Sequence, residues 1–301
     1  MRYWAAMDRL IEIFGVALFL GLGLVFVPLE RLIPFHAQPV LRRQWLSDLG
    51  FWVFNRPLLL VLAFLYVGAI GGGLGFAVPV GATTWVGALP LWASVPLALL
   101  VADLTFYCFH RAAHAIPVLW QFHAVHHSIE KLDWLASVRV HPLDQLFTTI
   151  SGVALQLALG FSVETLAITG TVYLWQSHFV HSNLRVSLGP LRWLIAGPAF
   201  HHWHHSDRPE ARDKNFAGQL PFLDRLLGTA HFPEKEFSQT YGIPDPVPSA
   251  YPSALLYPFR RLARMARGLP LEPGEGVHGA DSASDQSPLE RANFRRDGGE
   301  K

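Results

Sequence analysis

The sequence is poor in cysteine and in charge. Its 301 residues include one cysteine, Cys108, which excludes an internal disulfide and any metal or iron–sulfur site built from several cysteines; we expect it to pack within an apolar segment. Charged residues make up 16% of the chain, whereas soluble domains carry about 25%. With 51% hydrophobic residues and a mean hydropathy of +0.26, the chain is expected to be a membrane protein. The net charge of +1 gives no indication of nucleic-acid binding.

Three motifs of metal and redox enzymes are also missing. The H-E-x-x-H motif of zinc proteases does not occur. No Glu-x-x-His pair, which carboxylate-bridged di-iron bundles use, occurs between residues 91 and 233. No G-x-G-x-x-G lies in a strand–turn–helix setting, so the chain is not expected to bind a dinucleotide. Metal chemistry would therefore need other ligands, and electrons for a redox reaction would have to come from another protein.

Histidine is abundant between residues 110 and 231. There the sequence has an H-x3-H pair, two H-x2-H-H clusters and a further pair between them: His110 and His114; His123, His126 and His127; His178 and His181; and His201, His204 and His205. On a helix, residues three or four apart lie on one face. Neutral imidazole is the commonest metal ligand, and this many exceed the four ligands of one zinc site. We predict two metals side by side; the alternative is a histidine-rich surface.

Long apolar runs predict the membrane-spanning helices. Residues 13–29 are uncharged and just long enough for one span, and the charge-free run 57–102 is long enough for two. The shorter runs 146–159 and 163–175 predict a tilted or partly penetrating hairpin. The predicted fold is all-α and polytopic, with about three full spans, a short hairpin, and a helical cap that carries the histidine clusters.

The basic residues predict the orientation. Arg31, Arg42, Arg43 and Arg56 lie between the first two spans, and no basic residue lies between the second and the third. The positive-inside rule places this loop in the cytoplasm, and every histidine cluster then lies on the cytoplasmic face. Two basic residues before the first span, at positions 2 and 9, favour the opposite orientation.

The order of the motifs resembles the fatty acid hydroxylase superfamily, also called the sterol desaturase family. The resemblance covers roughly residues 91–233 and rests on DLTFYCFHRAAH, LWQFHAVHHS, RVHP, HSN, FHHWHHS and DKNFAGQLPFLDRLLGT, in this order. It implies an integral membrane, non-haem di-iron oxygenase that uses O2 to hydroxylate or desaturate a lipid. The substrate could be a sterol, a fatty acyl chain or a related lipid. A separate reductase with a ferredoxin-like or cytochrome b5-like carrier is also implied.

The resemblance also implies a ligand set. Nine histidines match the family pattern and are the predicted iron ligands: His110, His114, His123, His126, His127, His181, His201, His204 and His205. His178 is a candidate tenth ligand. His202 is turned about 100° from His201 on a helix, so we expect it behind the ligands or exposed. Asp103, in an apolar span, is the candidate that orients a ligand histidine. His141 is a further catalytic candidate; for it, Arg139 and Asp144 the alternative is a structural polar network.

The predicted domains are an N-terminal membrane anchor (1–90), the catalytic domain (91–233), a segment with a basic amphipathic helix (234–269), which suits an anionic membrane surface, and a disordered tail (270–301). Two other classes remain open. A membrane b-type cytochrome would hold its paired histidines within spans, and a metal-binding or transport protein without oxygenase activity would place ligands at mid-membrane.

Overall fold

The computed structural model describes residues 2–73, 85–233 and 238–271, and this part of the chain contains helices and no strands. The α-helices are α1 (Arg2–Leu32), α2 (Trp45–Gly73), α3 (Leu91–Ala115), α4 (Pro117–His127), α5 (Pro142–Gln145), α6 (Ser151–Ala158), α7 (Val163–His181), α8 (Pro198–His204), α9 (Phe222–Leu226) and α10 (Tyr251–Ala266). Three short 3₁₀ turns, η1 (Trp134–Val138), η3 (Gly189–Trp193) and η4 (Pro209–Ala211), and one π-helical turn, η2 (Leu146–Ile150), complete the set. The prediction of an all-α fold is confirmed.

Two helices are long and apolar enough to cross a membrane among the residues described, Gly15–Leu32 within α1 and Leu91–Ala115. Helix α2 contains the start of the second predicted span but begins at Trp45, so half of the predicted loop between Arg31 and Arg56 is helical. Residues 74–84, within the run predicted to form two spans, and most of the predicted disordered tail lie outside the described residues. The shorter apolar runs form η2 with α6, and α7, in the positions predicted for the hairpin.

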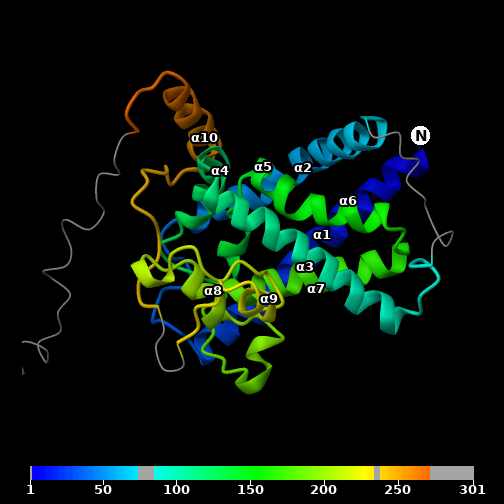
Figure 1. Ribbon diagram of the computed structural model, residues 1–301, viewed down its shortest axis with the longest axis horizontal. Helices are drawn as coiled ribbons and strands as arrows, with labels where there is room; N and C mark the ends of the chain where they lie inside the picture. Colours follow the sequence, from blue (N-terminus) through cyan, green and yellow to red (C-terminus); the bar gives the residue numbers. More distant parts are fainter. Residues whose placement is uncertain (1, 74–84, 234–237, 272–301) are drawn as a thin grey trace, which may run out of the picture.

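The long helices run along one direction of the molecule, and the short helices gather at one end of it (Figure 1). Helix α3 packs against α4, α6 and α7, and α7 packs against η1 and α8. All the predicted ligands lie at or beyond the ends of α3 and α7 at this crowded end. The bundle therefore serves as a frame that brings four separate histidine-bearing segments together.

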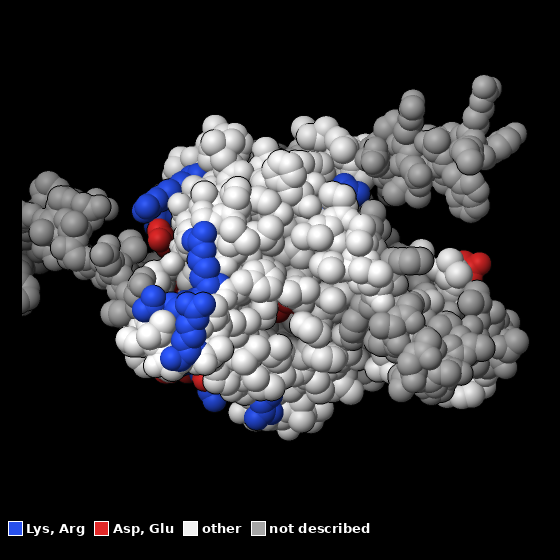
Figure 2. Space-filling view, turned by 90° about the horizontal axis from the view of Figure 1, so that it is seen from above, with Lys and Arg blue, Asp and Glu red and all other residues white. Residues whose placement is uncertain are grey.

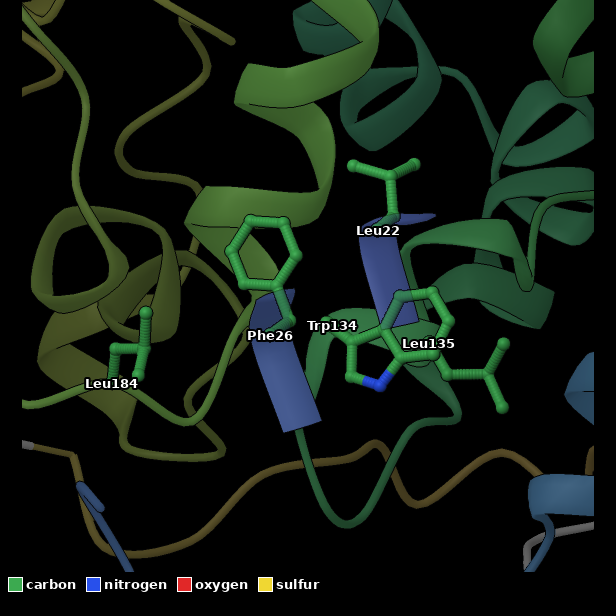
Figure 3. Packing of buried hydrophobic residues seen from close by; sticks show 5 residues of the cluster. All are labelled: Leu22, Phe26, Trp134, Leu135 and Leu184. Atoms are coloured by element: carbon green, nitrogen blue, oxygen red, sulfur yellow. The ribbon is translucent and has the colours of Figure 1, made fainter. Parts of the chain in front are cut away.

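Helix α1 is attached to this frame by one apolar cluster and one carboxylate. Leu22 and Phe26 of α1 belong to one buried cluster with Trp134, Leu135 and Leu184 (Figure 3). At the end of the same helix, Glu30 accepts hydrogen bonds from the backbone N–H groups of Trp134 and Asn183 at 2.8 and 2.9 Å. Helix α1 carries no predicted ligand, but it fixes the segments on either side of His178 and His181.

A proline sets the angle between the first two histidine helices. Ile116 is extended (φ −101°, ψ 114°), as the residue before a proline tends to be, and Pro117 opens α4 at its first turn. The chain therefore turns sharply between His114 and His123 instead of continuing as one helix. The turn lets imidazoles from α3 and α4 face each other.

A buried network of ions lies behind the histidines. Asp48 on α2 forms ion pairs with Arg42 and Arg139, and Asp133 pairs with Arg42 at 2.8 Å. All four side chains are buried, and buried charges are stable only when they are paired in this way. The backbone carbonyl of Arg139 accepts a hydrogen bond from His126. For Arg139, the prediction of a structural polar network near the site is confirmed.

The surface of the long helices is apolar. Leu20, Leu24 and Trp92 are 59%, 78% and 80% exposed, as expected of side chains that face lipid. Cys108 is also exposed on α3, so the prediction that it packs inside is wrong; the apolar run made packing and lipid contact indistinguishable. Figure 2 shows a mostly uncharged face, with Lys and Arg gathered toward the end that carries α10.

Candidate metal centre

The structure brings nine histidines into two adjacent groups. The first group contains His110, His114, His123, His127 and His204, and the second contains His126, His181, His201 and His205. Within each group the nearest ring nitrogens all lie within 4.8 Å of one another. His126 and His127 are neighbours on α4 yet belong to different groups, as do His204 and His205 in the segment of α8. Each H-x2-H-H cluster therefore contributes to both groups.

In the first group the Nε2 atoms converge. His123 Nε2 lies 3.0 Å from His110 Nε2 and 3.1 Å from His127 Nε2, and His127 Nε2 lies 3.1 Å from His114 Nε2. Two nitrogens bound at about 2.1 Å to one ion, roughly at right angles, would be about 3 Å apart. The spacing therefore fits shared coordination of one ion.

The outward-facing Nδ1 atoms in this group are held by the protein. His110 Nδ1 donates to the carbonyl of Phe216 at 2.7 Å, and His204 Nδ1 to that of Lys214 at 2.7 Å. Nδ1 of His114 faces a carboxylate oxygen of Asp213 at 3.1 Å, and Nδ1 of His123 faces one of Asp144 at 2.9 Å. Hydrogen bonds of this kind place the proton on Nδ1 and leave the Nε2 lone pair facing inward, as metal-bound histidines require.

The second group repeats the arrangement. His205 Nε2 lies 3.1 Å from both His126 Nε2 and His201 Nε2, and His181 Nε2 lies 2.9 Å from His201 Nε2. Nδ1 of His126 donates to the carbonyl of Arg139, and Nδ1 of His181 to that of Ser177. All ligands of this group are neutral imidazoles.

Two observations show that these groups fit metal ions better than a hydrogen-bonded core. Nε2 of His204 is buried and has no hydrogen-bond partner among the described residues, which costs free energy unless something binds it. Burial, reinforced by neighbouring imidazoles, lowers the pKa of His123, His127 and His204 well below the usual range. The imidazoles therefore stay neutral, and only the neutral form binds a metal.

The loop after the last histidine cluster holds two of the grouped histidines, because the carbonyls of Phe216 and Lys214 accept hydrogen bonds from His110 and His204. Asp103 accepts hydrogen bonds from the N–H groups of Gly218, Gln219 and Leu220 at 2.8 to 3.0 Å. The carboxylate of Asp224 accepts from those of Phe216 and Ala217, and Asn215 bonds to residues 200 and 231. Asp207 accepts from Thr240. Asn215 and Asp224 therefore tie down this loop.

Contrary to the prediction from the sequence, Asp103 does not contact a histidine directly. Its three hydrogen bonds are to loop amides and not to a histidine. It positions a ligand through the loop, since the carbonyl of Phe216 accepts from His110. The sequence pointed to a buried carboxylate but not to its partners, because these lie more than a hundred residues away.

Three of the histidines considered in the sequence analysis lie outside both groups. Nδ1 of His178 lies 2.7 Å from Ser137 Oγ and 2.9 Å from the carbonyl of Trp134, so the structure does not bring it to the metals. His141 caps α5 by accepting from the N–H of Leu143, and its Nε2 donates to the carbonyl of Leu255, which gives it a structural role instead of the predicted catalytic one. His202 is fully buried, not exposed, and bonds to Tyr241 and to the carbonyl of Ser182.

Two carboxylates that contact grouped histidines were not assigned from the sequence. The role of Asp144 was left open, and Asp213 was missed. Burial raises the pKa of Asp144 to about 6, so at neutral pH it is mostly an anion that accepts from His123. A hydrogen bond from His114 lowers the pKa of Asp213. Asp213 and Asn215 have φ of 56° and 59°, a conformation that Asn and Asp adopt more readily than most residues. The D-x-N spacing was the available signal for this bend.

A cavity of about 350 Å³ opens beside the histidines. Five ligands line it: His110 and His123 from the first group, and His126, His181 and His201 from the second. Its remaining wall follows α3, α6 and α7 and includes Phe106, Val153 and Leu166. The cavity is large enough for a small ligand and leads from the histidines between the long apolar helices.

Comparison with known proteins identifies the family of this domain. Residues 95–229 match the family model for fatty acid hydroxylase. Ornithine lipid hydroxylase OlsE of Rhizobium tropici is 33% identical over 60% of this chain and 54% of its own length. Alkylglycerol monooxygenases of Xenopus tropicalis and Danio rerio are 33% and 34% identical over 50% and 54% of this chain. The histidine-bearing region, residues 95–229, belongs to the fatty acid hydroxylase family.

The similarity covers part of each relative. The matched region is about half of the ornithine lipid hydroxylase and about a third of the two alkylglycerol monooxygenases, at 33% and 35%. No solved structure matches this chain. These relatives are, by name, a lipid hydroxylase and two alkylglycerol monooxygenases.

Proposed function

We propose that this protein is an O2-dependent, di-iron lipid hydroxylase or desaturase of the membrane. The observation that carries the proposal is the pair of imidazole groups, five and four residues strong, beside a cavity with apolar walls. Iron bound there would supply the activation of O2 and the removal of hydrogen from an unactivated C–H bond. The similarity to lipid hydroxylases supports a lipid substrate, which we take to be a sterol, a fatty acyl chain or a related lipid.

The residues of this chain hold the metals, position the substrate and exclude water. The nine grouped histidines supply neutral nitrogen ligands, and Asp144 and Asp213 fix the orientation of two of them. A hydrocarbon chain in the cavity would lie against Phe106, Val153 and Leu166 and end beside ligands of both groups. Holding the reacting carbon close and dry is the protein's main contribution to such a reaction.

We propose three membrane spans, α1, α2 and α3, with α6 and α7 as a partly inserted hairpin. The positive-inside rule and the common end of α3 and α7 support a metal centre at the cytoplasmic face. The arginine-rich face of α10 would rest on the membrane surface. Electrons would come from a separate reductase and its ferredoxin-like or cytochrome b5-like carrier.

The test is a metal count coupled to turnover. We expect about two irons per chain in protein purified without chelator, with zinc as the competing ion in overexpressed samples, because Zn²⁺ binds more tightly than Fe²⁺. Lipid extracts from membranes with and without the protein should differ by O2-dependent products. Active protein with one ion or none would rule out the two-metal site. Two ions without any O2-dependent product under reducing conditions would favour a metal-binding or transport protein, and a haem absorbance band would indicate a cytochrome.

A further inference from the structure

A second apolar cavity lies beside the first. It has a volume of about 290 Å³ and is lined by α1 and α2, with Leu18, Phe19 and Leu59 among its walls. None of the nine grouped histidines lines it. Polar residues, among them Asn55, Arg56 and His178, form part of the lining, but most of the lining residues are apolar, so a hydrocarbon chain can lie against them.

The two cavities share one wall. Ser137, Val140, Gln145, Leu174 and Ser177 line both of them. Along the last turns of α7, His181 lines only the first cavity and His178 only the second. The cavities therefore meet at one layer of side chains near the histidine-bearing end of α7, from which the first extends along α7 and the second lies between α1 and α2.

Hydrogen bonds hold the residues of this shared wall in place. Ser137 Oγ donates to the carbonyl of Trp134 and lies 2.7 Å from Nδ1 of His178, which joins the 137–145 segment to α7. From the other side, the side-chain amide of Asn55 on α2 donates to the carbonyl of Val140 at 2.7 Å. These bonds attach the shared wall to α7 on one side and to α2 on the other.

We infer that the second cavity holds the second hydrocarbon chain of a two-chain lipid whose first chain lies in the cavity beside the metals. This inference rests on the proposed function and adds to it the substrate class. Two adjacent slots that share a wall match two chains joined at one head group. Only the first slot touches ligands, so the wall keeps the second chain away from the oxidising centre. His178 then serves to hold the wall.

The experiment fills the second cavity and counts bound chains. Leu59→Trp puts an indole into the slot, while Leu58→Trp, one residue away and outside the lining, is the matched control. The probes are dipalmitoylglycerol and 1-monopalmitoylglycerol, which differ in chain number and share a minimal head group. Binding to the purified, metal-loaded protein is measured by native mass spectrometry, and each variant's metal content and melting temperature verify that it is folded.

We expect Leu59→Trp to weaken binding of the two-chain probe at least about tenfold, the effect of displacing only two or so buried methylenes. Binding of the one-chain probe should be unchanged, and Leu58→Trp should bind both as wild type does. Equal loss of both probes would mean that the cavity is an entry route, and no loss of either, or no binding to wild type, would mean that it holds no substrate chain. Each of these results overturns the inference. Because binding is read without turnover, the oxygenase proposal stands or falls separately.

Discussion

Nδ1 of His123 lies 2.9 Å from a carboxylate oxygen of Asp144, and both side chains are buried. The pair joins α4 to the short helix α5, which begins one residue after His141. In the second group of histidines, the Nδ1 atoms of His126 and His181 donate to backbone carbonyls, whereas in the first group those of His114 and His123 face carboxylates. The two metal positions therefore differ in the charge that surrounds them.

Asp144→Asn should weaken metal binding in the first group. The amide can accept one hydrogen bond from His123 but lacks the negative charge that makes the imidazole a stronger ligand, a loss typically worth about 10- to 100-fold in metal affinity or activity. Metal content and turnover on one preparation measure the effect. Asp213→Asn is the control, since Asp213 is 61% exposed and solvent weakens its interaction with His114, so its effect should be smaller. Equal effects of both substitutions would contradict this ranking.

His204→Ala and His202→Ala should separate metal binding from stability. His204 supplies a buried Nε2 to the first group, and no carboxylate is placed to replace it, so metal content and activity should fall to background. His202→Ala leaves the hydroxyl of Tyr241 and the carbonyl of Ser182 without this partner, at a cost of about 1–3 kcal/mol, but should keep most of the metal.

The readouts for these two variants are metal per chain and melting temperature, at equal expression in membranes. If His202→Ala lost metal as completely as His204→Ala did, the assignment of the ligand face of α8 would be wrong. If it kept its full melting temperature, the structural role of its two hydrogen bonds would be wrong.

Asp103→Asn should lower the melting temperature more strongly than it lowers the metal content. One of the three loop N–H groups would meet the amide NH₂ in place of an oxygen, which costs about 1–3 kcal/mol for a buried donor. A lower melting temperature with partly retained metal is the expected result, because His110 is reached only through Phe216. Tyr107→Phe is the control. It removes a buried hydroxyl from the same helix as Asp103, one that bonds to Thr229, and it leaves the three hydrogen bonds of Asp103 in place. A full loss of metal at an unchanged melting temperature would indicate direct action on a ligand.

Reporter fusions should show the orientation of the chain. A reporter at Lys301 should behave as cytoplasmic and one inserted at Gly81 as external, since the arginines between residues 31 and 56 face the cytoplasm under the positive-inside rule. The opposite pattern would mean that Arg2 and Arg9 determine insertion, and the metal centre would then face the other side. Removing these two arginines should leave the expected pattern unchanged.

The sequence by itself determined the helices and the identity of the nine grouped histidines. Spacings of three and four residues select the clusters, because a helix repeats every 3.6 residues and places such side chains on one face. The family resemblance was needed as well, since the spacing alone also selects His178, which lies outside both groups. The apolar runs likewise predicted α1, α3 and α7 with their approximate ends. These are local properties, which neighbouring residues fix without reference to the rest of the chain.

Only the tertiary structure decided how the histidines divide. His126 and His127 are adjacent in sequence but point toward different metals, because the turn at Pro117 and the packing of α4 against α3 set the direction of the helix. The tertiary structure also decided that Asp103 binds loop amides, that His178 bonds to the wall shared by the two cavities, and that Asp144 faces His123. Each of these contacts joins segments that are 21 to 117 residues apart, and no local pattern encodes which distant partner a buried polar group will meet.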